Sequence, residues 1–194
     1  MPSDMTVPVH NRVFVLVLQH PREKKEALAT APALVAGLAR AALVTGLSWR
    51  NLSAALGRPA DPGRWAVLYL GSARRAARAA VGEIVALDRR GEPLADQRAA
   101  LAGIEGIVLL DGSWKEAKSL WWRNPWLLKL RRIVLDPARP SRYRRLRREP
   151  SREALSTFEA AALALSRLDP GSGAAAALEA RLEALLAAAD GGQA

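Results

Sequence analysis

The sequence predicts an α/β fold in which a mostly parallel sheet is covered by helices on both faces. Short apolar runs of strand length alternate along the chain with segments of helical periodicity. The runs are apolar without a break, which is typical of strands that are buried on both faces. No internal repeat and no linker divides the chain. We therefore expect one domain over residues 12–190, preceded by a flexible N-terminus over residues 1–11.

The first half of the chain carries two strand patterns and three helix patterns. Residues 13–18 form an unbroken apolar run, and Pro21 prevents the strand from continuing beyond it. Pro32 suits the first turn of a helix, and its apolar stripe would consist of Leu34, Leu38, Ala41 and Ala42. The remaining elements expected here are a helix over 48–56, a strand over 65–70 and a helix over 73–80.

The second half continues the alternation and ends in two helices. Ser156 and Glu159 have the spacing of a capping box, and the helix after them would bury Phe158, Ala161, Ala162, Leu165 and Leu168. The last helix covers residues 174–189, with Leu178, Leu182, Leu185 and Leu186 on one side. The other expected elements are strands over 84–87, 107–110 and 133–135, a helix over 94–101 and a helix that begins at Trp114.

Asp111 stands where the strand 107–110 gives way to that helix. Gly112 permits a sharp turn, and Ser113 is a good residue to precede a helix. Open α/β sheets bind ligands at the carboxyl ends of their strands and at helix N-termini. Asp111 is therefore a candidate functional residue, with helix capping as the alternative. His20 follows another strand, and its alternative is a hydrogen-bonded turn.

Four of the six tryptophans lie between Trp114 and Trp126. Such residues can stack on bases, but large aromatic side chains at helical spacing more often fill a core. Trp114, Ala117 and Trp121 are spaced for one inner face of a helix. The same spacing leaves Trp122 and Trp126 as the tryptophans expected outside.

The charge of the chain is concentrated in one window. The formal net charge is +10 with a pI near 11.1, and residues 129–148 hold nine basic residues against one acidic residue. A concentrated basic segment is what binding to a polyanion requires; a solvated face is the alternative. Arginines grip phosphates, and a tyrosine can stack on an unpaired base. The candidate RNA-binding residues are Arg142, Tyr143, Arg144, Arg147 and Arg148.

Several function classes are disfavoured by composition. The chain has no cysteine, which removes disulfides, thiolate metal sites and cysteine nucleophiles. With two histidines, His10 and His20, we expect no metal site. No apolar run approaches the roughly 20 residues of a membrane span, and the N-terminus lacks a signal-peptide pattern. These features lead us to expect a soluble, cytoplasmic protein without a membrane partner.

Four motifs together resemble the DTW-domain family. They are an H-P-x-E turn at 20–23, Asp-Gly-Ser-Trp at 111–114, Ser-Arg-Tyr-Arg at 141–144 and an S-T-x-E-A helix start at 156–160. The resemblance covers residues 13–168. It implies a SPOUT-like fold with a C-terminal knot. It also implies transfer of the 3-amino-3-carboxypropyl group of S-adenosylmethionine to N3 of a uridine in tRNA. Members often carry an N-terminal cysteine cluster, which is absent here, and proline where this chain has Gly71.

The resemblance also implies where the site lies. Asp111, His20 and Trp114 would serve catalysis, and the cofactor would sit among Gly71, Ser72, Leu135, Leu155, Ser156 and Thr157. The chemistry suits these residue types, because uridine N3 must lose a proton as it attacks, and a carboxylate can accept that proton or orient the base. Three alternatives stay open: a catalytically silent RNA-binding module, a SPOUT-like RNA methyltransferase, and ribosomal RNA as the substrate.

Overall fold

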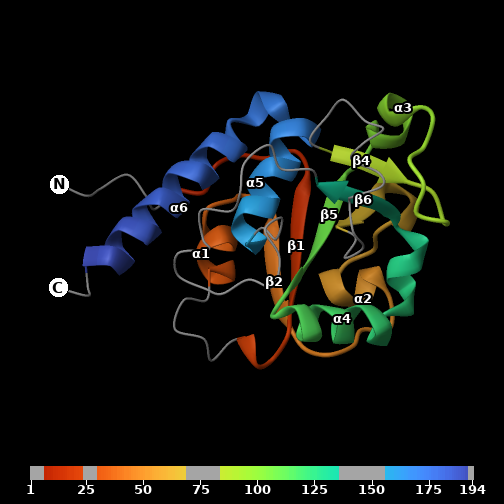
Figure 1. Ribbon diagram of the computed structural model, residues 1–194, viewed down its shortest axis with the longest axis horizontal. Helices are drawn as coiled ribbons and strands as arrows, with labels where there is room; N and C mark the ends of the chain where they lie inside the picture. Colours follow the sequence, from red (N-terminus) through yellow and green to blue (C-terminus); the bar gives the residue numbers. More distant parts are fainter. Residues whose placement is uncertain (1–6, 24–29, 69–83, 136–155, 192–194) are drawn as a thin grey trace.

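The computed structural model describes residues 7–23, 30–68, 84–135 and 156–191, and their core is a six-stranded sheet (Figure 1). The strand order is β2-β1-β5-β3-β6-β4, and every pair is parallel except β4 with β6. The strands are β1 (Phe14–Gln19), β2 (Ala41–Thr45), β3 (Trp65–Leu68), β4 (Ile84–Leu87), β5 (Gly106–Asp111) and β6 (Arg131–Leu135). The prediction of a mostly parallel α/β sheet is confirmed.

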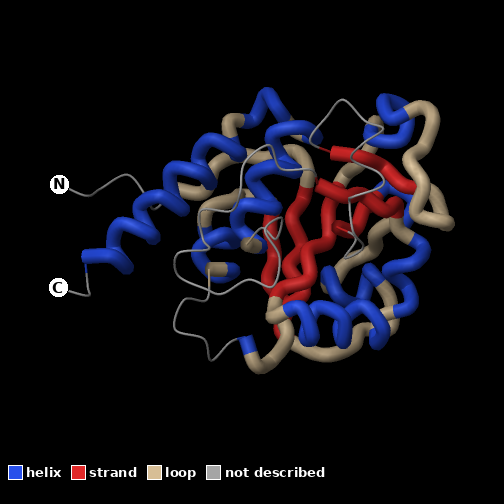
Figure 2. Tube along the Cα trace, in the orientation of Figure 1, coloured by secondary structure: helices blue, strands red, loops and turns tan. Residues whose placement is uncertain are grey.

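Helices cover both faces of the sheet (Figure 2). One face packs against α1 (Ala31–Ala36), α5 (Thr157–Leu168) and α6 (Ala174–Gly191), which share a core centred on Phe158 and Leu165. The other face packs against α2 (Leu52–Leu56), α4 (Trp114–Arg123) and the 3₁₀ turn η4 (Pro125–Lys129). Shorter elements are α3 (Gln97–Leu101) and the 3₁₀ turns η2 (Pro62–Arg64) and η6 (Pro170–Ser172).

The connections after β1 and β5 leave the sheet towards opposite faces. The chain after β1 continues into α1 on one face, whereas the chain after β5 continues into α4 on the other. Since β1 and β5 are neighbours, their carboxyl ends form a switch point, where open α/β sheets bind ligands. The residues that follow these two strands are therefore the candidates for a binding site.

The helix predicted from Pro32 to Ala42 is wrong beyond Ala36. Helix α1 ends at Gly37, and the next residues cross to the sheet, where Ala41–Thr45 pair with β1 as strand β2. Two other helices begin later than predicted, because Asn51 caps α2 and Asp96 caps α3 with its carboxylate. The helix predicted over 73–80 lies outside the described residues.

The tryptophans of this region are arranged differently from the prediction. Trp122 is exposed as expected, but Trp126 is buried at 6% exposure, because the chain turns at Asn124 and the indole N–H donates to Asn124 Oδ1. Ala117 is buried and Trp121 half-buried, whereas Trp114 is 48% exposed instead of facing the core. The α4 helix thus presents two tryptophans to solvent.

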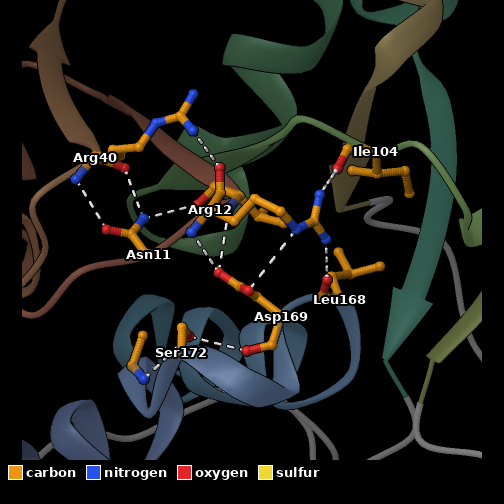
Figure 3. A network of polar contacts seen from close by, with 9 residues as sticks. Asn11, Arg12, Arg40, Ile104, Leu168, Asp169 and Ser172 are labelled. Carbon is orange, nitrogen blue, oxygen red and sulfur yellow. Dashed lines mark hydrogen bonds and ion pairs between the residues drawn. The ribbon is translucent and has the colours of Figure 1, made fainter.

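A polar cluster stabilises the end of the sheet at which strands β1 and β5 begin (Figure 3). The carboxylate of Asp169, at the end of α5, accepts the backbone N–H groups of Arg12 at 2.6 Å and Val13 at 3.3 Å. The Arg12 guanidinium donates to the carbonyls of Ile104 and Leu168. This cluster ties the start of β1 to the end of α5.

The chain before β1 also belongs to the folded part. Val9 pairs with Leu38, and the fully buried Asn11 donates to the carbonyls of Val13 and Arg40. Val9 and Asn11 lie within the N-terminus that was expected to be flexible over residues 1–11.

Gly106 provides a direct test of the sheet packing. The Trp65 ring on β3 lies over Gly106, and a Cβ there would be 2.6 Å from the nearest ring atoms. We expect Gly106→Ala to lower the free energy of unfolding in urea by about 2 kcal/mol through overpacking. Gly171→Ala is the matched control, since a Cβ at Gly171 meets nothing within 4 Å. Equal stability of the two variants would contradict the packing described.

Candidate active site

Three neighbouring strands each end in a polar residue at their carboxyl ends. Thr45, Gln19 and Asp111 are the last residues of β2, β1 and β5, and they stand in register. The Thr45 hydroxyl donates to Gln19 Oε1 at 3.2 Å, and Gln19 Nε2 donates to Asp111 Oδ2 at 3.0 Å. This line of hydrogen bonds places the carboxylate of Asp111 at the switch point.

Asp111 is buried and is bonded from two sides. Asp111 is 6% exposed. Its Oδ1 accepts a hydrogen bond of 2.5 Å from the hydroxyl of Thr157. Thr157 is the first residue of α5, whose first turn carries backbone N–H groups without partners inside the helix. Asp111 therefore links β5 to α5, while Ser113 and Glu116 form the capping box of α4. The predicted capping box of α5 is confirmed: Ser156 Oγ accepts from the Glu159 N–H, and the Glu159 carboxylate accepts from the Ser156 N–H.

Gly112 allows the chain to turn sharply after Asp111. Its φ of 151° is a conformation that side chains rarely adopt, and a Cβ would lie 2.9 Å from the Cβ of Glu116 and 3.3 Å from that of His20. The turn brings the end of β1 against the first turn of α4. The backbone N–H of His20 completes this junction by donating to the Asp111 carbonyl at 2.9 Å.

His20 is held in the turn after β1. Its Nδ1 accepts the N–H of Arg22 at 3.3 Å and lies 3.6 Å from Glu116 Oε1. The backbone N–H of Glu23, itself buried at 4% exposure, donates to the His20 carbonyl and closes the turn. These contacts agree with the hydrogen-bonded turn residue that was the alternative for His20. Among the described residues, these contacts engage Nδ1 and none engages Nε2.

Glu116 caps the start of α4 and faces His20. One carboxylate oxygen accepts from both the backbone N–H and the hydroxyl of Ser113. Burial alone would raise the pKa of Glu116, but the two Ser113 donors and the charges of His20 and Arg22 together lower it below 4.5. The carboxylate is consequently charged throughout the neutral pH range.

This lowered pKa predicts how stability depends on pH. Because the folded pKa lies below the unfolded one, the charge of Glu116 stabilises the protein above about pH 4.5, and this contribution is lost as the pH falls through the folded value. We expect Glu116→Gln to cost about 0.5 kcal/mol at pH 7. In urea unfolding, the difference from wild type should shrink in acid; a difference that stays constant with pH would contradict this origin.

Several predicted site residues come together, while others lie elsewhere. Asp111, His20, Ser156 and Thr157 meet at the edge just described, and Trp114 begins the helix beside them. Leu135 ends β6, two strands from β5, which is about 10 Å along the sheet. The predicted residues outside the described part of the chain are Gly71, Ser72, Leu155, Arg142, Tyr143, Arg144, Arg147 and Arg148.

The sequence analysis missed three residues of the site. Gln19 carried a usable signal, because it is the polar residue that directly ends an apolar strand. Thr45 carried none, since its strand was assigned to a helix. Glu116 has capping-box spacing from Ser113, the same signal that identified Ser156 and Glu159. Across the described ranges, no three His, Asp or Glu side chains are grouped so as to hold a metal ion.

Comparison with known proteins identifies the family of this chain. The DTW domain model matches residues 2–189. The chain belongs to the DTW-domain family. In this DTW-domain chain, the Asp111-Gly-Ser-Trp114 segment that carries the resemblance forms the junction of β5 and α4, where the buried carboxylate lies.

The DTW-domain relatives include two named enzymes. The chain is 28% identical over 84% of its length to tRNA-uridine aminocarboxypropyltransferase 2 of Macaca fascicularis. It is 31% identical over 80% of its length to the protein of the same name in Drosophila melanogaster. The aligned parts are 50% and 56% of these proteins, so the chain spans about half the length of the curated relatives it matches. No solved structure matches the chain.

Proposed function

We propose that this protein transfers the 3-amino-3-carboxypropyl group of S-adenosylmethionine to N3 of a uridine in tRNA. The observation that carries the proposal is the buried carboxylate of Asp111 at the switch point of a DTW-domain sheet. The names of the relatives support the reaction and the tRNA substrate. A SPOUT-like topology with a C-terminal knot is part of the proposal.

The described residues fit an S-adenosylmethionine molecule. The first turn of α5 offers N–H donors for the carboxylate of its amino acid part. Leu68 and Leu135 end the adjacent strands β3 and β6 half-buried, where they can provide an apolar wall for the adenine. In this proposal Ser156, Thr157 and Leu135 contact the cofactor. Gly71, Ser72 and Leu155, which lie outside the described residues, are assigned to the same site by the family resemblance.

Asp111 would accept the N3 proton of the uridine or hold the edge of the base that carries it. When bound, S-adenosylmethionine supplies an electrophilic methylene on sulfonium sulfur, so that N3 gains a carbon while the carbon–sulfur bond breaks. The N3–H proton must leave, and a buried carboxylate beside it can accept the proton or hold the base edge in place. Thr157 and Gln19 fix both oxygens of Asp111, which limits the directions from which the base can approach. His20, through Nε2, and Trp114 would position the base.

The RNA substrate is supported by charge. The chain carries +10, concentrated over residues 129–148, and RNA phosphates are the complementary surface. We assign phosphate contacts to Arg142, Arg144, Arg147 and Arg148, and stacking to Tyr143. None of the helices described in this structure has the length and apolar character that crossing a membrane requires. A cytoplasmic location is proposed, since that is where a tRNA substrate would be met.

Labelled donor tests the proposal against its alternatives. Purified full-length protein is incubated with unmodified tRNA and S-adenosylmethionine, labelled either in the carboxyl group or in the methyl group. The proposal predicts transfer of the carboxyl label without the methyl label, because the aminocarboxypropyl group contains the carboxyl carbon and not the methyl carbon. Transfer of methyl label would instead identify a methyltransferase. If neither label is transferred and calorimetry detects no binding of S-adenosylmethionine, the protein is a silent RNA-binding module.

A further inference from the structure

Helix α4 presents aromatic and cationic side chains together on its exposed side. Trp114, Lys118 and Trp122 follow one another at four-residue spacing, so they lie on one face of the helix. Lys115 and Arg123 flank this row, and all five side chains are exposed. We call these five residues the α4 stripe. The single acidic residue of the helix, Glu116, points instead to Ser113 and His20.

Trp122 does not contribute to the hydrophobic core of the described residues. It is 78% exposed, more than any other large hydrophobic side chain in the described residues. A lone exposed apolar residue is ordinary, but two exposed indoles among three cations form a patch, and such patches mark interaction sites. Lys118 Nζ already lies 5.3 Å from the centre of the Trp114 ring, which illustrates how the stripe combines positive charge with aromatic faces.

The stripe is rigid and begins at the candidate active site. Trp114 comes three residues after Asp111, so its end of the stripe lies beside the buried carboxylate. The other end is anchored by Asn124, whose fully buried amide donates to the carbonyls of Leu120 and Leu47 and accepts from the Trp49 N–H. A platform held at both ends loses little freedom when it binds.

We propose that the α4 stripe binds the unpaired segment that contains the target uridine, with the target base at Trp114, a second base stacked on Trp122, and phosphates on Lys115, Lys118 and Arg123. The two tryptophans are eight residues apart, about 12 Å along the helix axis. This is the length of three to four stacked nucleotides, so the rings engage two different bases. Aromatic platforms within a positive groove are how proteins bind single-stranded nucleic acid without sequence preference. The inference rests on the proposed function only for the identity of the RNA.

The test uses fluorescence anisotropy with a labelled oligouridylate of about ten residues, and an RNA duplex of the same length for comparison. Trp122→Ala should weaken binding of the single strand about tenfold, whereas Trp122→Phe, which keeps a ring, should stay within about threefold of wild type. Duplex binding should change less than about twofold, because paired bases do not stack on side chains. Since Trp122 is exposed, the variants should unfold at the wild-type temperature.

The role of the lysines is tested by measuring how the affinity for RNA depends on salt concentration. Replacing Lys115 and Lys118 by alanine should flatten the dependence of log affinity on log salt by about 1.4, whereas Arg98→Ala on the distant, exposed α3 should leave the slope unchanged. A Trp122→Ala variant that binds single-stranded RNA like wild type overturns the inference, and so does one that instead loses affinity for phosphatidylserine vesicles. If wild-type protein transfers no group to tRNA, the proposed function fails, while the oligouridylate result still decides the stripe.

Discussion

Asp111→Asn should abolish most of the modification activity and leave the fold intact. We expect single-turnover transfer to fall about 100-fold or more, the usual contribution of a general base. The structure indicates why the variant should fold: Thr157 can still donate to the amide oxygen. Gln19 can rotate its own amide so that its oxygen accepts from the new N–H, because its other partner, the Thr45 hydroxyl, can accept as well as donate.

The measurement is single-turnover transfer to tRNA, beside binding of S-adenosylmethionine by calorimetry. Asn should retain cofactor binding within a few-fold, since it keeps the size of the side chain. Thr157→Ser is the matched control, because it preserves the hydroxyl that contacts Asp111 and should keep activity within about tenfold. A fall of less than tenfold in Asp111→Asn would mean that the carboxylate serves only to join β5 to α5.

Asp169→Ala should produce the largest loss of stability. Its removal leaves the N–H groups of Arg12 and Val13 without their acceptor, and Val13 is fully buried. Each unsatisfied buried donor costs about 1–3 kcal/mol, so we expect the free energy of unfolding to fall by about 3 kcal/mol. The ion pair with Arg12 adds little, because its atoms are 3.9 Å apart and the Arg12 side chain is 56% exposed.

The control for this prediction is Asp169→Asn, which removes the charge and keeps an acceptor oxygen. It should cost about 1 kcal/mol in urea unfolding. The cluster lies around the residues that precede β1 and β5, whereas Asp111 is the last residue of β5, so the rate of transfer by the folded variants should match wild type. Equal losses for the two variants would indicate that the charge, and not the satisfied backbone donors, provides the stability.

Local patterns predicted those parts of the fold that local physics determines. The apolar runs became buried strands, and the Ser156–Glu159 spacing became a capping box, because both depend on a few adjacent residues. Asp111 was predicted as a candidate site residue for the same reason, as an acid directly after such a run. Its contact with Thr157 joins residues 46 positions apart, and no local pattern reports that distance.

The errors have related causes. Ala41–Thr45 is a short apolar segment that suits either a helix or a strand, and its pairing with β1 decides the outcome. Trp126 was expected outside because the helical period was extended across Asn124-Pro125, where the chain turns. Trp114 was placed in the core by its spacing with Ala117 and Trp121, but it lies in the first turn of α4 and is exposed.

Nucleoside mass spectrometry tests the central claim most directly. This claim is that the chain adds the aminocarboxypropyl group to a tRNA uridine, with Asp111 as the residue that accepts or positions the N3 proton. Unmodified tRNA is treated with S-adenosylmethionine and either wild-type protein or Asp111→Asn, then digested to nucleosides. We predict that wild type produces a uridine heavier by about 101 mass units, the mass of the group presented to N3, and that Asp111→Asn produces almost none. A gain of about 14 mass units, or equal product from both proteins, would contradict the account.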